Sequence, residues 1–188
     1  LEVFGHGALC MCYSGQCFLS AVLGGRSGNR GLCAQPCRLA FRWPGEKTPS
    51  HPLSLKDLSL AGALGQLEEM GVACLKIEGR AKSAYYAAIV TGAYRHCIDD
   101  VAAGCPVDPV WRDEVEHVSH RHYSTGFFYG QPGQFTESSR YIRQWQICAV
   151  VEACDADGSA VLSLRNKFSV GDEVEIVGPD CRPFAWTV

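Results

Sequence analysis

The chain has 188 residues, of which 47% are hydrophobic and 20% charged, and its formal net charge is −3. These proportions are ordinary for a globular protein, and the length allows one substantial domain or one domain with a small module. No apolar run approaches the roughly 18 residues that a transmembrane helix needs, so we expect no membrane partner, and the net charge argues against broad attraction to nucleic acid.

Cysteine is unusually frequent, with 11 residues in 188. That fraction, 11/188 or about 6%, is below the roughly 8–10% of small disulfide scaffolds. The count is odd, and Cys74, Cys97 and Cys148 stand singly in helix-like or strand-like contexts. We therefore predict a reducing, cytoplasmic compartment in which some cysteines serve as ligands.

The predicted elements begin with a strand in "EVFGHGAL", and a start in mid-strand suggests the C-terminal part of a longer protein. A short helix or turn is expected at 15–25, a loop at 24–31, and a strand at 37–43. In residues 53–71 leucines recur at helical spacing, which predicts a helix with Asp57 or Ser59 as its cap and Gly71 at its end.

A strand at 72–80 and a helix at 83–104 capped by Ser83 give the α/β rhythm of a barrel or of a doubly wound sheet. From about residue 144 the pattern becomes all-β, with "DADG" as a hairpin turn. We divide the chain into a partial α/β barrel at 1–105, a connecting segment at 106–143, and a truncated β-rich module at 144–188. Charged residues at the C-terminal ends of barrel strands face the active site, and Lys76, Glu78 and Arg80 hold such positions.

Four cysteines near the N-terminus, Cys10, Cys17, Cys33 and Cys37, have the spacing C-x6-C-x15-C-x3-C. All lie in or beside loops, so their sulfurs can converge without breaking an element. Between Glu2 and Glu46 there is no acidic residue but there are four arginines, Arg26, Arg30, Arg38 and Arg42. Positive surroundings suit an iron–sulfur cluster, whose thiolates add negative charge. A zinc site and ordinary packing remain alternatives, and Cys12 is a substitute for Cys10.

Several ordered motifs resemble those of the peptidase U32 family. They are "EVFGHGALCMCYSGQCFLS" at 2–20, "GGRSGNRGLCAQPCR" at 24–38, "LSLKDL" at 53–58, "LKIEGRAKSAYY" at 75–86 and "SHRHYSTGFFYG" at 119–130. The resemblance covers almost the whole chain, and the Cys-x3-Cys pair in "CAQPCR" looks most like the branch that forms 5-hydroxyuridine in tRNA.

The resemblance implies an α/β fold, the C-terminal part of a TIM-type barrel followed by a small β-barrel-like module. It implies a 4Fe-4S cluster on Cys10, Cys17, Cys33 and Cys37, with zinc as the alternative metal. It further implies hydroxylation of the tRNA wobble uridine, prephenate as a small anionic co-substrate, and a paired U32 subunit as partner.

Other residues are candidates for contact with substrate. Arg26, Arg30, Lys76 and Arg80 suit the carboxylates of an anionic donor, since guanidinium groups bind them through paired hydrogen bonds. Asn29 either positions its loop or simply tolerates a left-handed turn. Glu78 is a candidate acid–base group or half of a surface salt bridge. His6 either contacts substrate or cluster, or is a structural histidine.

Two other functions stay open. A peptidase of collagenase type would need a nucleophile such as Ser14, Ser27 or Cys12 with His6 as base, although neither H-E-x-x-H nor G-x-S-x-G is present. The other is a cluster-bearing scaffold subunit that is inactive alone.

Overall fold

The structure, a computed structural model, describes residues 1–13 and 15–188. The chain divides into two compact units: Leu1–Arg80 with His120–Ile142, and Ala81–Ser119 with Arg143–Val188. These units are discontinuous, unlike the three consecutive segments expected from composition, because the chain leaves the first unit after Arg80 and returns to it at His120.

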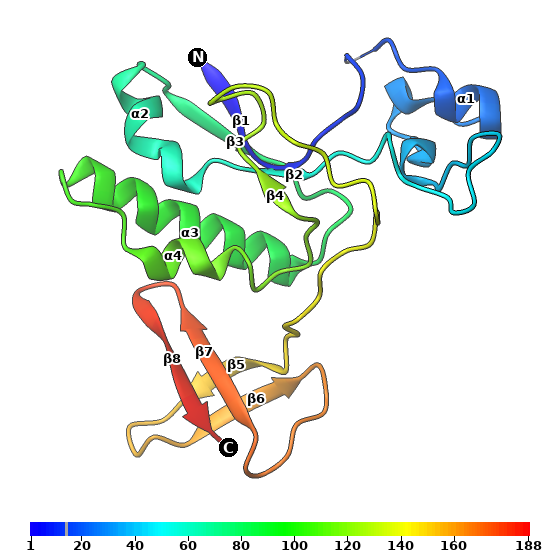
Figure 1. Cartoon of the computed structure of the whole chain (residues 1–188). Helices are drawn as coiled ribbons and strands as arrows, with labels where there is room; N and C mark the ends of the chain where they lie inside the picture. Colours follow the sequence, from blue (N-terminus) through cyan, green and yellow to red (C-terminus); the bar gives the residue numbers. More distant parts are fainter. Residues whose placement is uncertain (14) are drawn as a thin grey trace. The chain divides into compact units, whose positions relative to one another are not determined.

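A four-stranded sheet organises the first unit (Figure 1). Its order is β3-β1-β2-β4, with bounds β1 Glu2–Ala8, β2 Asp57–Ser59, β3 Cys74–Ile77 and β4 Tyr123–Ser124. The pairs β1–β3 and β2–β4 are parallel, whereas β1–β2 is antiparallel. A TIM-type barrel is all-parallel, and the strands of residues 1–13 and 15–188 close no such barrel, so barrel membership remains a prediction.

Gly7 permits a close approach between two chain segments at the end of β1. Its φ is +132°, and a Cβ at this position would lie 2.8 Å from the carbonyl oxygen of Glu78. The backbone N–H of Glu78 donates to the carbonyl of His6 at 2.9 Å. Glycine is required here because any side chain would push β1 away from the residue that follows β3.

Between residues 37 and 71 one predicted element is wrong, and a predicted helix is present but begins later than expected. Residues 37–43 form no strand: η2 (Pro36–Arg38) is a 3₁₀ turn, and beyond it only an isolated bridge joins Phe41 to Ser50. The helix α2 spans only Leu64–Glu69, after η3 (Ala61–Ala63). Asp57, expected as a helix cap, lies in β2, where its carboxylate pairs with a distant arginine. Tertiary pairing therefore overrides the local helical pattern.

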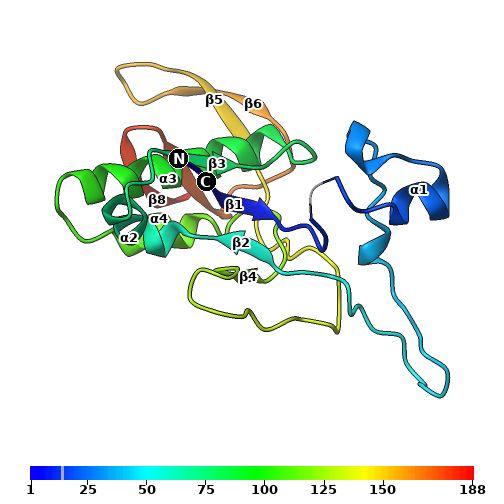
Figure 2. The ribbon, with the colours of Figure 1, turned by 90° about the horizontal axis from the view of Figure 1, so that it is seen from above.

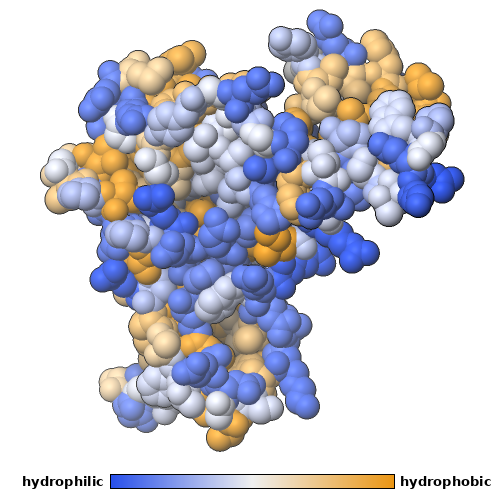
Figure 3. All heavy atoms as spheres, in the orientation of Figure 1, coloured by the Kyte–Doolittle hydropathy of each residue, from blue (hydrophilic) through white to orange (hydrophobic). Residues whose placement is uncertain are grey.

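The cysteine-rich segment lies apart from the sheet, and two runs of chain connect it with β1 and β2 (Figures 1 and 2). It holds the predicted short helix α1 (Leu19–Gly24), η1 (Gly28–Arg30) and η2. Its apolar side chains are largely exposed, as Phe18 (64%) and Val22 (79%) show (Figure 3). Because little apolar surface is buried, hydrogen bonds must fix the geometry of this segment.

Two helices begin the second unit. The helix α3 (Ala84–Ala102) occurs as predicted, and the Ser83 hydroxyl accepts from the N–H of Tyr86 at 3.2 Å. The helix α4 (Pro109–Glu114) was not predicted, although the Asp108 cap and Pro109 at its first position are a recognised start signal. Trp111 of α4 stacks on His96 of α3 at 3.8 Å between ring centroids.

The last 40 residues form strands only, as their alternation predicted. They make two antiparallel hairpins, β5 (Ala149–Cys154) with β6 (Ala160–Leu164), and β7 (Glu173–Gly178) with β8 (Cys181–Thr187). The predicted "DADG" turn joins the first pair, with Gly158 at φ +88°. These strands close no barrel among the described residues. None of the described helices combines the length and apolar character that crossing a bilayer requires.

Candidate cysteine-ligand site

Cys37 is half-buried, and burial raises the pKa of its thiol. The guanidinium of Arg38 opposes this shift, while Cys33 and Cys10 raise the pKa further. Two of the other predicted ligands therefore act electrostatically on Cys37, and Cys17 is not among its main influences. The convergence of all four sulfurs on one centre stays a prediction.

A strained turn joins Cys33 to Cys37. Gln35 has φ +54°, and it is the one non-glycine residue with positive φ in the described chain. Its N–H donates to the Cys33 sulfur at 3.3 Å, and the η2 turn that follows contains Cys37. This hydrogen bond orients the Cys33 sulfur relative to the turn, and sulfur is the atom with which cysteine binds a metal.

Arg38, directly after Cys37, fastens the segment to the sheet. Its guanidinium donates to the carbonyls of Leu9 at 2.8 Å and Leu55 at 2.6 Å, and to the Ser54 hydroxyl at 3.2 Å. Leu9 precedes Cys10, and Leu55 leads into β2. One side chain therefore ties the η2 turn, which bears Cys37, to the run that bears Cys10 and to the run that enters β2. Burial and the nearby charge of Arg121 lower the pKa of Arg38.

A buried ion pair lies next to this clamp. The Arg121 guanidinium lies 3.3 Å from the Asp57 carboxylate, and the Arg121 N–H donates to the same carboxylate at 3.0 Å. The Arg121 side chain also donates to the carbonyl of Ser139 at 3.1 Å and lies over the Tyr141 ring. The pair joins β2 to the segment that enters β4.

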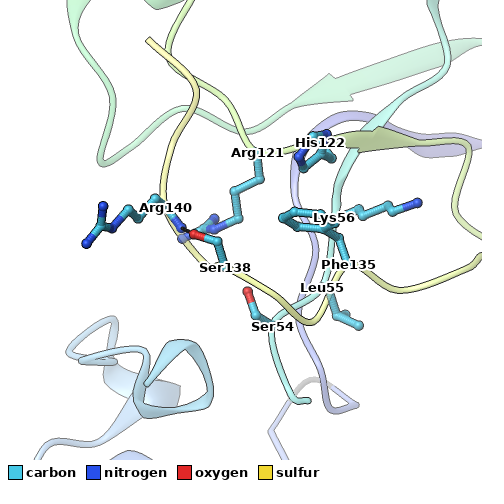
Figure 4. A pocket seen from close by; sticks show the side chains of 8 residues that line it. All are labelled: Ser54, Leu55, Lys56, Arg121, His122, Phe135, Ser138 and Arg140. Atoms are coloured by element: carbon cyan, nitrogen blue, oxygen red, sulfur yellow. Dashed lines mark hydrogen bonds between the residues drawn. The ribbon is translucent and has the colours of Figure 1, made fainter. Parts of the chain in front are cut away.

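An open hollow beside this ion pair is lined by cationic groups (Figure 4). Its walls are Ser54, Leu55, Lys56, Arg121, His122, Phe135, Ser138 and Arg140. In the described part of the chain, the side chains of Lys56 and Arg140 form no ion pair. Figure 4 shows the charged ends of Lys56 and Arg140 pointing to opposite sides, away from Arg121, so these two cations can meet phosphate or carboxylate groups at the rim of the hollow.

The described thiols form no ready-made tetrahedral zinc site. Tetrahedral zinc, with Zn–S bonds of about 2.3 Å, would bring its sulfurs to about 3.8 Å from one another. Among the described residues, no three cysteine sulfurs lie within 4.8 Å of one another. A cubane cluster is larger than one ion, so its four thiolates stand further apart. The arginines and the N–H donor to Cys33 also suit an anionic cluster.

The two predicted catalytic residues differ in exposure. His6 is fully buried, and its Nε2 lies 3.2 Å from the Tyr123 hydroxyl, which fits the structural alternative. Glu78 is 28% exposed and accepts from the Arg80 N–H at 3.0 Å, while the Arg80 side chain lies 3.6 Å away in a surface ion pair. This contact fits the salt-bridge alternative for Glu78.

The predicted substrate-binding residues are all exposed. The Arg26 side chain donates to the Leu32 carbonyl at 3.0 Å, and Asn29 donates to the Gly15 carbonyl at 3.1 Å. These two residues therefore brace the cysteine-rich segment. Arg30 lies in η1, Lys76 in β3 and Arg80 just after β3. The substrate-binding role of all five stays a prediction.

The peptidase alternative gains no geometric support from the described chain. Ser14 lies outside the described residues. The side chains of Ser27 and Cys12 form no hydrogen bond with a histidine in the remainder of the chain. A nucleophile needs such a base within hydrogen-bond reach.

The sequence did not single out Arg121, Lys56 or Arg140, and it treated Arg38 only as part of the local charge. A local signal existed for Arg38, which directly follows a candidate ligand. Arg121 lies in the quoted "SHRHYSTGFFYG" motif, but its partner Asp57 is 64 residues away. Sequence spacing alone does not reveal such a contact.

Comparison with known proteins identifies the family. The sequence matches the model of Peptidase family U32 over residues 1–138 and that of the Peptidase family U32 C-terminal domain over residues 143–188. The chain belongs to the peptidase U32 family, as its motifs predicted. No solved structure matches it.

Three relatives carry descriptive names. The chain is 36% identical to tRNA hydroxylation protein P1 of Bacillus subtilis (strain 168), over 100% of this chain and 49% of that protein. It is 42% identical to the 23S rRNA 5-hydroxycytidine C2501 synthase of Escherichia coli (strain K12), over 54% of this chain and 16% of that protein. It is 30% identical to the Collagenase of Porphyromonas gingivalis, over 95% of this chain and 53% of that protein. Apart from the longer rRNA enzyme, the chain spans about half the length of these relatives.

The Arg38 clamp makes a testable claim about local stability. Replacing Arg38→Met removes donors to the carbonyls of Leu9 and Leu55, and we expect the segment to open more easily by about 2 kcal/mol. That corresponds to roughly 30-fold faster amide exchange. Hydrogen–deuterium exchange of peptides covering residues 31–41, in reduced protein, measures the effect.

Arg42→Met is the matched control, because the Arg42 side chain is exposed and has no partner in the described structure. We expect its exchange to equal that of the wild type. Equal exchange in both variants would show that Arg38 does not hold the segment.

Proposed function

We propose that this chain takes part in the hydroxylation of an RNA base, and that the base is the wobble uridine of tRNA. The observation that carries the proposal is the similarity to the Bacillus subtilis tRNA hydroxylation protein P1 along the entire chain. The similarity to an rRNA 5-hydroxycytidine synthase supports the coarser class, hydroxylation of a pyrimidine in RNA.

The chemistry needs a redox-active partner. Hydroxylation replaces a C–H bond of the base by C–OH and removes two electrons from the base. A 4Fe-4S cluster held by Cys10, Cys17, Cys33 and Cys37 would supply one-electron chemistry when bound. Prephenate, implied by the family resemblance, is our proposed source of the hydroxyl group and our proposed acceptor of the two electrons, which it takes up as its own C–OH becomes C–H.

The other residues of the site would bind and orient the substrates. Arg38 would hold Cys37 and the run that bears Cys10 in place, through its bonds to Leu9 and Leu55. Lys56 and Arg140 of the hollow would attract RNA phosphates or the donor's carboxylates. The Asp57–Arg121 ion pair would keep one wall of the hollow rigid.

Proteolysis is the second candidate, because a relative of similar coverage is named Collagenase. The two functions depend on different residues. Gelatin cleavage that survives Cys33→Ala but is lost on replacing a serine or histidine would favour the peptidase.

We expect a deletion strain to lose 5-hydroxyuridine and its derivatives from tRNA, and the intact gene to restore them. Genes with Cys33→Ala or Cys37→Ala should restore less than about a tenth of the modification, since a cluster with a missing ligand is lost or inactive. Mass spectrometry of digested tRNA nucleosides measures this.

Cys105→Ala is the control for these variants, since Cys105 is an exposed cysteine of the second unit. It should restore the modification fully. An unchanged nucleoside profile in the deletion strain would refute hydroxylation of tRNA, and rRNA nucleosides from the same cells would then test the rRNA alternative.

The hollow makes a separate prediction about RNA affinity. We expect the double variant Lys56→Gln, Arg140→Gln to bind tRNA more weakly and to reduce the slope of log affinity against log salt by about 1–2. Fluorescence anisotropy at several salt concentrations measures the slope. Lys167→Gln, at an exposed lysine of the C-terminal module, is the control. An unchanged slope in the double variant would mean that phosphates bind elsewhere.

A further inference from the structure

A second cluster of ligand-type side chains lies in the other unit, formed by Glu114, His117 and Glu175. Glu114 is the last residue of α4, His117 follows one turn later, and Glu175 lies in β7. One ligand atom from each residue falls within 4.8 Å of the other two. The His117 Nδ1 lies 3.1 Å from the Glu175 carboxylate and 3.3 Å from that of Glu114.

Local structure explains why these groups converge. A spacing of three residues on a helical turn puts Glu114 and His117 on the same face. Glu-x-x-His is also the spacing with which helices of carboxylate-bridged metal proteins present ligands to an ion. The Trp145 ring stacks on the His117 ring at 3.9 Å, and the Tyr85 hydroxyl donates to the His117 carbonyl at 3.4 Å. These contacts fix the orientation of the imidazole.

The cluster leaves one polar atom without a partner. The Glu114 side chain is 3% exposed, and its Oε2 forms no hydrogen bond in the described structure. No lysine or arginine pairs with Glu114 or Glu175 among the described residues. A buried carboxylate oxygen without a partner lowers the stability of the folded protein, since buried charges are normally paired or bound to metal.

The electrostatics of the cluster agree with a missing positive charge. Burial raises the pKa of Glu114 to about 7, and the charges of Glu175 and Asp113 and a hydrogen bond with Glu175 raise it further. Burial also raises the pKa of the nearby Tyr85 to about 12, with Glu114 and Glu175 adding to the effect. These shifts reflect the same burial and close approach of carboxylates that the distances show.

We propose that Glu114, His117 and Glu175 form a binding site for a divalent first-row transition cation with nitrogen and oxygen ligands. One imidazole and two carboxylates suit Mn²⁺, Fe²⁺ or Zn²⁺, and no thiolate takes part. Glu114 and His117 belong to the part of the chain that matches the U32 family model, and Glu175 belongs to the part that matches the C-terminal domain model. The ion therefore fastens β7 to the end of α4.

Binding of Mn²⁺ alone tests the site, since this ion prefers oxygen and nitrogen ligands and competes poorly for the cysteines. Reduced full-length protein, freed of loosely bound ions, is titrated with Mn²⁺ and followed by electron paramagnetic resonance. We expect about one tight equivalent per chain, with affinity at least tenfold lower in Glu175→Gln and in His117→Gln. Mn²⁺ should also raise the melting temperature of the wild type but not of these variants.

Glu173→Gln is the matched control, because Glu173 is an exposed carboxylate on the same strand. Its Mn²⁺ affinity should equal that of the wild type. Wild-type affinity no higher than that of Glu175→Gln would overturn the proposal and leave a proton shared by the two carboxyls in place of the metal. An equal loss of affinity in Glu173→Gln would also overturn it, since the binding would then follow overall charge. The titration contains no RNA, so a failure to bind Mn²⁺ would not bear on the proposed hydroxylation.

Discussion

The geometry of the cysteine-rich segment depends on one guanidinium group. Arg38 donates to the carbonyls of Leu9 and Leu55 and to the hydroxyl of Ser54. The segment buries little apolar surface, so packing does not replace these bonds. A charged donor to a carbonyl forms a stronger bond than a neutral one, and an arginine can serve several acceptors in one plane. Because Arg38 directly follows Cys37, bonds that fix Arg38 also restrict the position of this proposed ligand.

The same arginine links the segment to the charge balance of the sheet. Burial and the charge of Arg121 lower the pKa of Arg38, and the charge of Asp57, which pairs with Arg121, opposes this shift. The resulting environment is positive on the side of the cysteines and of the hollow. Thiolates, phosphates and carboxylates are all anions, so one field can serve the cluster and the proposed substrates together. This shared charge is the physical reason why the proposed hydroxylation is assigned to the first unit.

Local sequence predicted the elements whose signals are local. The cap at Ser83 and the segment that follows it identified α3, and "DADG" identified a hairpin turn. The pattern failed at 53–71 because Asp57 is stabilised by Arg121, which is distant in sequence. It missed α4 because the helix has only six residues, too few to show periodicity.

The residues of the candidate site also divide into those predicted from local signals and those that depend on distant contacts. The ligand role of the cysteines stays a prediction that rests on local signals, since their spacing and acid-free surroundings lie within 28 residues, from Cys10 to Cys37. The clamp, the ion pair and the hollow depend on contacts between remote segments, which a single sequence does not reveal. The cluster in the second unit combines a local and a distant signal. Glu114 and His117 form an i, i+3 pair that the sequence shows, whereas only the fold brings Glu175 to them.

The central claim is that Cys10, Cys17, Cys33 and Cys37 hold one inorganic centre. Iron and acid-labile sulfide analysis of anaerobically purified protein, together with its Mössbauer spectrum, tests this most directly. The account predicts about four irons and four sulfides per chain, lost when Cys37 is replaced by serine. One zinc ion per chain without sulfide, or an iron content that does not change in Cys37→Ser, would contradict it.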